Sequence, residues 1–250
     1  QVRCDVKVIS VPQVQIEKKE GYVIVTINRP EKKNALSLDV LRSIEAALNE
    51  LKGIKAVIFT GSGSFFSAGG DLGVMYSLDR SQGTEFSKIG NDIMDKIEEF
   101  EGVTIAAIEG GAYGGGLELA LSCDVRVASQ DSKLGLTEVN LGLFPGWGGM
   151  KRLRKAVGYS MAKYLALTGS VITGNDAYRI GLVNVLCDHP LRCAEELASS
   201  LSSKSLESFK SIKHLISRDP YDSSEESKMF GEILWSDQAR TALSKFLKLK

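Results

Sequence analysis

The amino-acid sequence predicts an α/β fold, with a core of strands and helices over residues 14–180 and a helical region over residues 181–250. Two observations support this prediction. In the core, short β-branched runs bounded by turn residues alternate with segments whose apolar residues recur at helical intervals. After Pro145 the strand pattern fades, and only helical segments remain. This order indicates a sheet covered by helices, followed by a helical appendage.

The first strands and the first helix are clearly marked. Residues 23–27 read Val-Ile-Val-Thr-Ile and end at an Asn-Arg-Pro turn, which predicts a strand. Residues 14–20 are expected to form the other arm of a hairpin that turns at Gly21. Ser37 is a typical N-cap for the periodic apolar helix that stops at Gly53. Further elements are predicted as strands over 56–60, 103–108 and 124–128, a helix up to Phe100 and a short apolar helix over 114–122.

The rest of the chain is predicted to be helical. The expected helices cover residues 160–168, 174–180, 190–202, 205–216 and 223–246. Residues 1–13 precede the first strand and are expected to be an N-terminal extension or linker. A length of 250 residues fits one large domain with a helical appendage.

Composition excludes several classes of function. Lys and Arg total 31 and Asp and Glu total 31, so the formal net charge is zero and no overall field attracts nucleic acid or anionic lipid. No apolar run approaches the roughly 20 residues that cross a bilayer. The first residues lack the pattern of a signal peptide, and we expect a cytoplasmic protein. The four cysteines, at positions 4, 123, 187 and 193, match no common zinc or redox spacing, and we expect four reduced thiols.

Two glycine-rich segments each follow a predicted strand. Residues 67–72 read Ser-Ala-Gly-Gly-Asp-Leu, and residues 110–118 read Gly-Gly-Ala-Tyr-Gly-Gly-Gly-Leu-Glu. Glycine lets a ligand approach backbone N–H groups, and three glycines at a helix start present free N–H groups with the helix dipole behind them. Either segment alone is more often a tight turn. The two together predict an anion or oxyanion site.

Other catalytic arrangements are not indicated. The second glycine segment lacks the G-x-G-x-x-G register, and no Gly-Lys-Ser/Thr sequence is present for a P-loop. The two histidines, His189 and His214, lie in the helical region, so a Ser-His-Asp or Cys-His triad lacks a base, and no metal site is indicated. Carboxylates remain as the acid and base candidates.

Two glutamates stand among apolar residues. Glu118 lies one turn into the short helix after the second glycine segment, and Glu138 lies within Leu-Thr-Glu-Val-Asn-Leu-Gly over 136–142. A carboxylate in an apolar setting tends to a raised pKa, which suits proton transfer near neutral pH. A salt-bridged or exposed glutamate is the simpler interpretation of either one alone. The pair beside an oxyanion segment favours catalysis.

These motifs, in this order, resemble the enoyl-CoA hydratase/isomerase (crotonase) superfamily. The resemblance runs from about Val14 to the C-terminus, and it rests on Asn28-Arg29-Pro30 with Asn34-Ala35-Leu36, on residues 66–72, on residues 114–120, and on residues 136–142 with 145–149. It implies a crotonase-like spiral of ββα units, with residues 181–250 as a helical oligomerisation region.

The resemblance also implies roles for the site residues. The backbone N–H groups of Gly70 and Gly115 would form the oxyanion hole for the thioester carbonyl. Glu118 would activate a water for attack at C3 and Glu138 would exchange the proton at C2, which converts a trans-2-enoyl-CoA into a 3-hydroxyacyl-CoA. No metal or redox cofactor is implied, because coenzyme A is part of the substrate. The substrate-binding residues would be Ala68, Gly70, Asp71, Leu72, Gly73, Gly115 and Gly146.

Some positions depart from the family pattern or leave the activity open. Typical hydratases often carry Ala at Gly70 and Lys at Ser64, so a CoA contact is absent here or supplied elsewhere. An enoyl-CoA isomerase, which needs only one base, is the alternative activity. An RNA-binding member would need a basic first helix, whereas residues 37–45 carry only Arg42. Candidates for the CoA phosphates are Arg29, Lys32 and Lys33, with a solvated turn as the alternative.

The resemblance implies an assembly as well. The family forms trimers, often paired into hexamers, and we expect a homotrimer or homohexamer that binds acyl-CoA and neither nucleic acid nor membrane. Phe246 resembles an aromatic residue of the family's last helix, which reaches a neighbouring subunit's CoA. Trp147 is expected to shape the acyl pocket or to pack in the core. Residues 1–13 would fit a linker to a 3-hydroxyacyl-CoA dehydrogenase in a fused protein.

Overall fold

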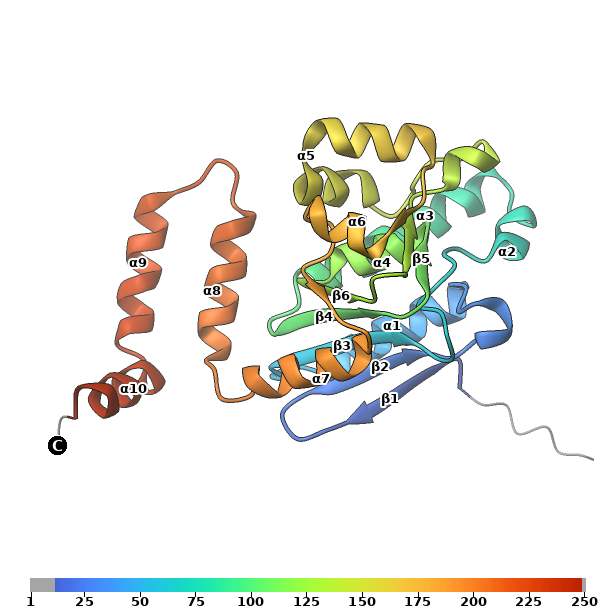
Figure 1. The fold of residues 1–250 in the computed structure, drawn as a ribbon. Coiled ribbons are helices and arrows are strands. Elements are labelled where there is room, and N and C mark those ends of the chain that lie inside the picture. Colours follow the sequence, from blue (N-terminus) through green and yellow to red (C-terminus); the bar gives the residue numbers. More distant parts are fainter. Residues whose placement is uncertain (1–11, 249–250) are drawn as a thin grey trace, which may run out of the picture.

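The computed structural model describes residues 12–248, so the prediction for residues 1–13 falls mainly outside the described residues. The main sheet has the strand order β1-β2-β3-β4-β6-β9 (Figure 1). Its strands are β1 (Val14–Lys18), β2 (Val23–Ile27), β3 (Ala56–Gly61), β4 (Val103–Ile108), β6 (Val125–Ala128) and β9 (Val185–Leu186). β1 and β2 form the predicted antiparallel hairpin, and every other neighbouring pair in this sheet is parallel.

Helices connect most of the parallel strands, and α7 (Pro190–Leu201) follows the last of them. The connecting helices are α1 (Leu38–Glu50), α2 (Leu72–Tyr76), α3 (Arg80–Glu98), α4 (Gly115–Ser122), α5 (Gly149–Thr168) and α6 (Gly174–Arg179), with 3-10 turns η1 (Pro30–Lys32) and η2 (Glu138–Leu141). Ser37 caps α1 as predicted, since its side chain accepts a hydrogen bond from the Val40 N–H. The prediction of one helix up to Phe100 is wrong, because Asp79 and Gln82 form a capping box that starts α3 separately from α2.

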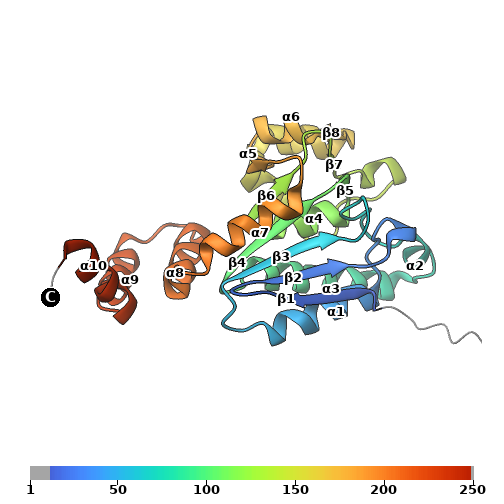
Figure 2. The same cartoon turned by 60° about the horizontal axis from the view of Figure 1, so that its bottom comes forward.

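Alternate residues of the parallel strands point to opposite faces of the sheet. Phe59 of β3 packs in the main core with α1 and α3, whereas the neighbouring Ile58 packs in a second core with Ala194 and Ala198 of α7. Figure 2 shows α1 and α3 on one side of the strands and α7 on the other. Both β9 and α7, which lie beyond residue 180, are therefore packed with the sheet.

A small second sheet positions the second glycine segment. It has the order β5-β7-β8, formed by β5 (Gly111–Tyr113), β7 (Lys133–Gly135) and β8 (Ile172–Thr173). Sequence patterns missed these strands, and the expectation that no strand follows Pro145 is wrong for β8 and β9. Runs of two or three residues are too short to show an alternating pattern. Because β5 leads directly into α4, this sheet sets where α4 begins.

The last three helices stand away from the sheet in both views (Figures 1 and 2). They are α8 (Leu206–Ser217), α9 (Ser223–Leu234) and α10 (Asp237–Leu247). The predicted single helix over 223–246 is wrong, because Ser236 caps a new helix by accepting from the Ala239 N–H. Lys213 of α8 joins this region to the core through Asp124 at 2.8 Å and the Phe100 carbonyl at 2.7 Å.

The helix α5 is longer than the predicted helix and contains one break. The predicted helix over 160–168 is the second half of α5, which begins at Gly149 and is interrupted by non-helical backbone at Gly158.

None of the helices within residues 12–248 is both long and apolar enough to cross a membrane.

Cys187 and Cys193 form a disulfide, so the prediction of four reduced thiols is wrong. The bond joins the residue after β9 to the first turn of α7. The turn between them, in which Pro190 is the first helical residue, brings the two Cα atoms to 6.6 Å, within the range of a disulfide. The Cys-x5-Cys spacing alone does not reveal this turn. Cys123 is free and buried, and Cys4 lies outside the described residues.

Candidate active site

The two glycine-rich segments meet beside the start of α4. The Tyr113 N–H donates to the Ser67 carbonyl at 3.0 Å, which pairs the start of the first segment with β5. Gly116 then lies directly against Ser67, since a Cβ on Gly116 would be 2.4 Å from the Ser67 carbonyl oxygen. A Cβ on Gly115 would likewise be 3.2 Å from the Gly70 nitrogen. Glycine at both helix positions is therefore what allows the two backbones to approach.

The N–H groups of Gly70 and Gly115 are both available to a ligand. Gly115 is the first residue of α4, so its N–H has no partner within the helix. Among the described residues, neither N–H donates to a backbone carbonyl. The positive end of the α4 dipole adds to the attraction for a negatively charged oxygen. Two such donors on one spot can bind an oxyanion.

Glu118 is held by a turn from a different part of the chain. Its side chain is 2% exposed, and its Oε1 accepts from the N–H groups of Trp147 and Gly149 at 2.8 Å each. Burial, together with the nearby carboxylate of Glu138, raises the pKa of Glu118 to about 7 against the effect of these two hydrogen bonds. The group can therefore both accept and release a proton near neutral pH.

Glu138 faces the same space from η2. It is the first residue of that turn, and a Cβ on Gly114 would be 3.1 Å from its Oε1. Gly114 has φ +49°, a conformation that favours glycine, so the carboxyl group lies over a backbone that no side chain shields. Burial raises the pKa of Glu138. Its Oε2 is buried and has no hydrogen-bond partner within residues 12–248, which indicates a site for a ligand or water.

A cavity of about 680 Å³ joins these groups. Its lining includes Glu118, Glu138, Gly70 and Gly115 together. Most of the remaining wall is apolar, with Leu72, Met75, Leu78, Phe86, Leu141, Leu143, Phe144 and Trp147. The cavity can therefore hold an apolar group that places an oxygen at the two glycine N–H groups, with both carboxyl groups on the same cavity wall.

The predicted substrate-binding residues are not all equally placed. Five of the seven, Ala68, Gly70, Leu72, Gly115 and Gly146, line the cavity, whereas Asp71 and Gly73 are not among the lining residues.

The carboxylate of Asp71 caps α2 by accepting from the N–H groups of Gly73 and Val74. It also accepts from Arg29 at 2.9 Å and from Lys32 at 3.4 Å.

The same ion pair affects the expected CoA phosphate contacts. Arg29 is 8% exposed, and its guanidinium is committed to Asp71 and to the Ala35 carbonyl. Lys32, which also pairs with Asp71, and Lys33 are both exposed, so their ammonium groups are accessible from solvent.

Trp147 combines both expectations made for it. Its indole is 4% exposed and packs edge-on against Phe86 with ring centroids 5.3 Å apart, and it also lines the cavity. A Cβ on Gly115 would be 2.3 Å from the Trp147 ring, so the indole lies against the oxyanion segment. Sequence reasoning missed the other contribution of this residue, the backbone N–H that binds Glu118. Backbone donors have no side-chain signature, and the glycines at 146, 148 and 149 are the only local signal.

The comparisons with known proteins agree with this geometry. Residues 17–249 match the family model described as enoyl-CoA hydratase/isomerase. The chain is 36% identical to the short-chain-enoyl-CoA hydratase of Clostridium acetobutylicum over 246 residues, which cover 94% of each protein. It is 43% identical to the crotonyl-CoA hydratase of Syntrophomonas wolfei over 173 residues, 68% of this chain and 66% of that one.

Solved structures give the same result for the fold. The crystal structure of an enoyl-CoA hydratase from Bacillus anthracis matches with a TM-score of 0.89 at 29% sequence identity, covering 94% of this chain and 96% of that chain. This similarity confirms the predicted α/β fold with its helical C-terminal region.

Proposed function

The chain belongs to the enoyl-CoA hydratase/isomerase family, and from this premise we propose that it is an enoyl-CoA hydratase, which adds water reversibly to trans-2-enoyl-CoA thioesters. One observation carries the proposal: two carboxyl groups, Glu118 and Glu138, line the same cavity as the two free glycine N–H groups. The similarity of the chain to the hydratases of Clostridium acetobutylicum and Syntrophomonas wolfei supports the same reaction.

The oxyanion hole lowers the energy of the charged intermediate. Attack of water at C3 moves negative charge onto the thioester oxygen, where the Gly70 and Gly115 N–H groups bind it. Both donors are fixed by the backbone, so they stabilise the charge without reorganising. Loss of one such donor typically costs about 3 kcal/mol of transition-state stabilisation.

The two carboxyl groups divide the proton transfers. Glu118 accepts a proton from the attacking water, whose oxygen bonds to C3, and Glu138 delivers a proton to C2, so the elements of water add across the double bond. The Oε1 of Glu118 is occupied by two N–H groups, which leaves its Oε2 for the water. The partnerless Oε2 of Glu138 suits the transferable proton. Coenzyme A is part of the substrate, and the proposed reaction uses no metal or redox cofactor.

An enoyl-CoA isomerase is the alternative activity, and an isotope experiment separates the two. The purified protein is supplied with a trans-2-enoyl-CoA or with the 3-enoyl isomer in water enriched in oxygen-18. A hydratase incorporates one heavy oxygen into the product of the 2-enoyl substrate. Conversion of the 3-enoyl to the 2-enoyl thioester, with no heavy oxygen incorporated from either substrate, would contradict the proposal.

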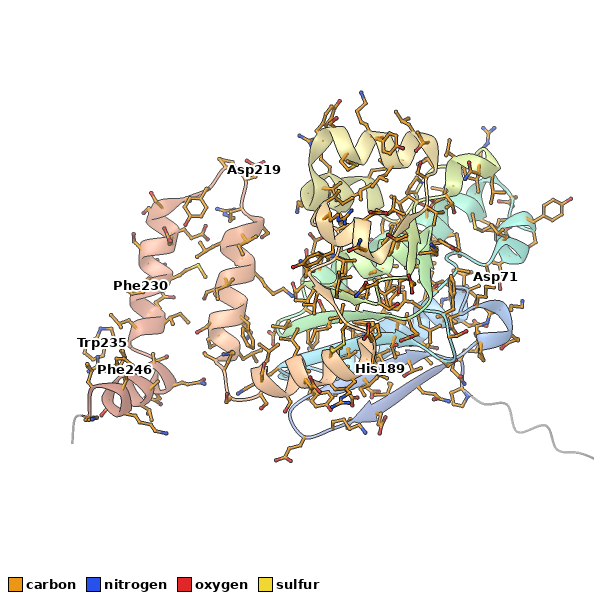
Figure 3. All side chains as sticks on the ribbon, in the orientation of Figure 1. Asp71, His189, Asp219, Phe230, Trp235 and Phe246 are labelled. Atoms are coloured by element: carbon orange, nitrogen blue, oxygen red, sulfur yellow. A yellow bond between two sulfur atoms is a disulfide. The ribbon has the colours of Figure 1, made fainter. Side chains whose placement is uncertain are left out.

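The proposed assembly is a homotrimer or homohexamer formed through the C-terminal helices. Large apolar side chains on α8–α10 support it, since Phe230 is 66% exposed, Trp235 73% and Phe246 83% in the single chain. Figure 3 shows Phe230 on α9, Phe246 on α10 and Trp235 at the turn between these two helices. Exposed apolar groups of this number mark an interaction surface. In such an assembly Phe246 would lie near the CoA of a neighbouring subunit, and the enzyme would act in the cytoplasm.

A further inference from the structure

The peptide unit between Gly146 and Trp147 is bound on both of its polar ends. Its N–H donates to Glu118 Oε1 at 2.8 Å. Its carbonyl oxygen accepts from Ser87 Oγ and from Asn91 Nδ2, at 2.7 Å each. The side chains of Ser87 and Asn91 therefore reach the Glu118 carboxylate through a single peptide group.

These two donors belong to one face of α3. Ser87 and Asn91 are four residues apart, and Asp95 and Glu98 continue the same face along the helix. Asp95 and Glu98 bind the guanidinium of Arg152, whose Nη1 donates to the Trp147 carbonyl at 3.0 Å. One helix face thus fixes two successive carbonyl groups of the turn that holds Glu118.

This arrangement has an electrostatic consequence. A carbonyl that accepts two hydrogen bonds polarises its own peptide group, so the N–H at the other end becomes a stronger donor. A stronger donor stabilises the ionised form of the carboxylate that it binds. The two bonds also fix the direction in which the Trp147 N–H points, and with it the orientation of the Glu118 carboxyl group.

We propose that Ser87 and Asn91 are positioning residues of the reaction, which act through the Gly146–Trp147 peptide to orient Glu118 and to keep it ionised as the base. The inference rests on the proposed function of Glu118. A purely structural interpretation, in which the two side chains only dock α3 onto the turn, predicts a loss of stability without any change in Glu118 itself. The two interpretations therefore differ in a measurable property of one carboxyl group.

The charges that face Glu118 come from three elements. Glu138 of η2 raises its pKa, and Arg152 of α5 lowers it. Asp95 and Glu98 of α3 lie behind Arg152 and pair with it. Replacing Ser87 or Asn91 by alanine removes no charge from this set, so a change in the titration of Glu118 would report on the hydrogen bonds.

The experiment compares the full-length wild type with Ser87→Ala, Asn91→Ala, the double variant and Asp92→Ala. Asp92 is the control on the same helix, because it lies on the exposed side and its ion pair is with Lys88, away from the turn that holds Glu118. The titration of Glu118 is followed by carbon-13 NMR of side-chain-labelled glutamate and is assigned with Glu118→Gln. In parallel, kcat and KM for crotonyl-CoA hydration are measured against pH.

We expect the double variant to raise the pKa of Glu118 by about one unit and to move the acid limb of kcat by the same amount, with KM changed less than about threefold. Each single variant is expected to raise the pKa of Glu118 by less than the double variant, and Asp92→Ala is expected to leave it unchanged. Ser87→Thr keeps the hydroxyl group, so its Glu118 should titrate as in the wild type.

An unchanged Glu118 titration in the folded single variants, or in the folded double variant, would overturn the inference. If the wild type fails to hydrate crotonyl-CoA, the proposed function fails, and the NMR titration still decides whether Ser87 and Asn91 act on Glu118.

Discussion

At the scale of single residues, Glu118 combines burial with a functional position. A carboxylate that is 2% exposed destabilises a protein unless hydrogen bonds compensate, and here two backbone N–H groups do so only in part. Buried groups with pKa values displaced toward neutrality are concentrated at catalytic sites. The raised pKa of Glu118 thus agrees with its proposed role as a base.

The first prediction concerns pH. If Glu118 must be ionised to accept a proton, kcat should rise as the pH increases through about 7, where its pKa lies. Glu138 interacts with Glu118, so the apparent value belongs to the coupled pair. The measurement is the pH dependence of kcat with saturating crotonyl-CoA. An acid limb near the ordinary glutamate pKa of about 4.3 would contradict this role.

The second prediction concerns stability. Because the folded state raises the pKa of Glu118, the protonated form favours folding, and this contribution is lost as the pH rises through about 7. Glu118→Gln should therefore be more stable than the wild type at pH 8, by at most about 3 kcal/mol, and nearly inactive. The free energies of unfolding of both proteins are measured in denaturant at pH 5 and pH 8. A variant that is more stable than the wild type only at pH 5 would contradict the prediction.

The third prediction tests the close approach at Gly115. A Cβ there would be 2.3 Å from the Trp147 ring, so Gly115→Ala should displace the oxyanion N–H and lower kcat by about 10²-fold. Overpacking should also cost about 1–3 kcal/mol of unfolding free energy. The stability control is Gly231→Ala, a helical glycine with open space around it. Unchanged turnover of Gly115→Ala would remove this N–H from the oxyanion site.

At the scale of elements, the ion pair between Asp71 and Arg29 fixes the first oxyanion segment. It ties η1 and its flanking residues to the start of α2, and the Leu36 N–H adds a hydrogen bond to the Gly69 carbonyl. Burial acts to raise the pKa of Asp71, but its hydrogen bonds to Arg29 and Val74 and the charges of Lys32 and Arg29 lower it overall. The segment that presents the Gly70 N–H is thus held from outside the cavity.

The fourth prediction follows from this ion pair. Asp71→Asn keeps an N-cap but loses the charge, and it should destabilise the protein by about 1–3 kcal/mol at neutral pH. A lowered pKa stabilises the fold above the unfolded value of about 3.9, and this stabilisation is lost as the pH falls through the folded value. The difference between wild type and variant in thermal unfolding should therefore shrink below about pH 4. A difference that is independent of pH would contradict the ionic origin.

Elements differed in how well the sequence predicted them. The strands β2 and β4 match their predicted bounds, because β-branched runs of five or six residues between turn signals leave little ambiguity. The strands β5, β7, β8 and β9 were missed, and α9 and α10 were merged, because very short runs and a single capping serine carry too little pattern. The disulfide between Cys187 and Cys193 depends on a turn that the spacing does not specify.

The residues of the site also differ in whether the sequence alone could predict them. Glu118 and Glu138 could be found because each is a charged residue in an apolar segment, and the structure places both on one cavity. The backbone donors of residues 147 and 149, and the support of their turn by α3, could not be found, because they depend on tertiary contacts between segments about 30 to 60 residues apart.

At the scale of the whole molecule, the C-terminal helices are the proposed contact between subunits. The fifth prediction is that the purified protein is a trimer or hexamer by light scattering, and that the double variant Phe230→Ser, Trp235→Ser shifts it toward the monomer. Tyr159→Ser is the control, since Tyr159 is an aromatic residue of α5 with 63% exposure that lies outside these helices. A monomeric wild type would contradict the proposed assembly.

In the proposed mechanism both carboxyl groups of one cavity, Glu118 and Glu138, carry out the hydration. The most direct test is the hydration of crotonyl-CoA by the wild type and by Glu138→Gln, followed by the loss of the ultraviolet absorbance of the conjugated thioester. We predict rapid loss with the wild type and a rate lower by about 10²–10⁴ with the variant, while crotonyl-CoA binding is nearly unchanged. Wild-type rates with Glu138→Gln, or no absorbance loss with the folded wild type, would contradict the claim.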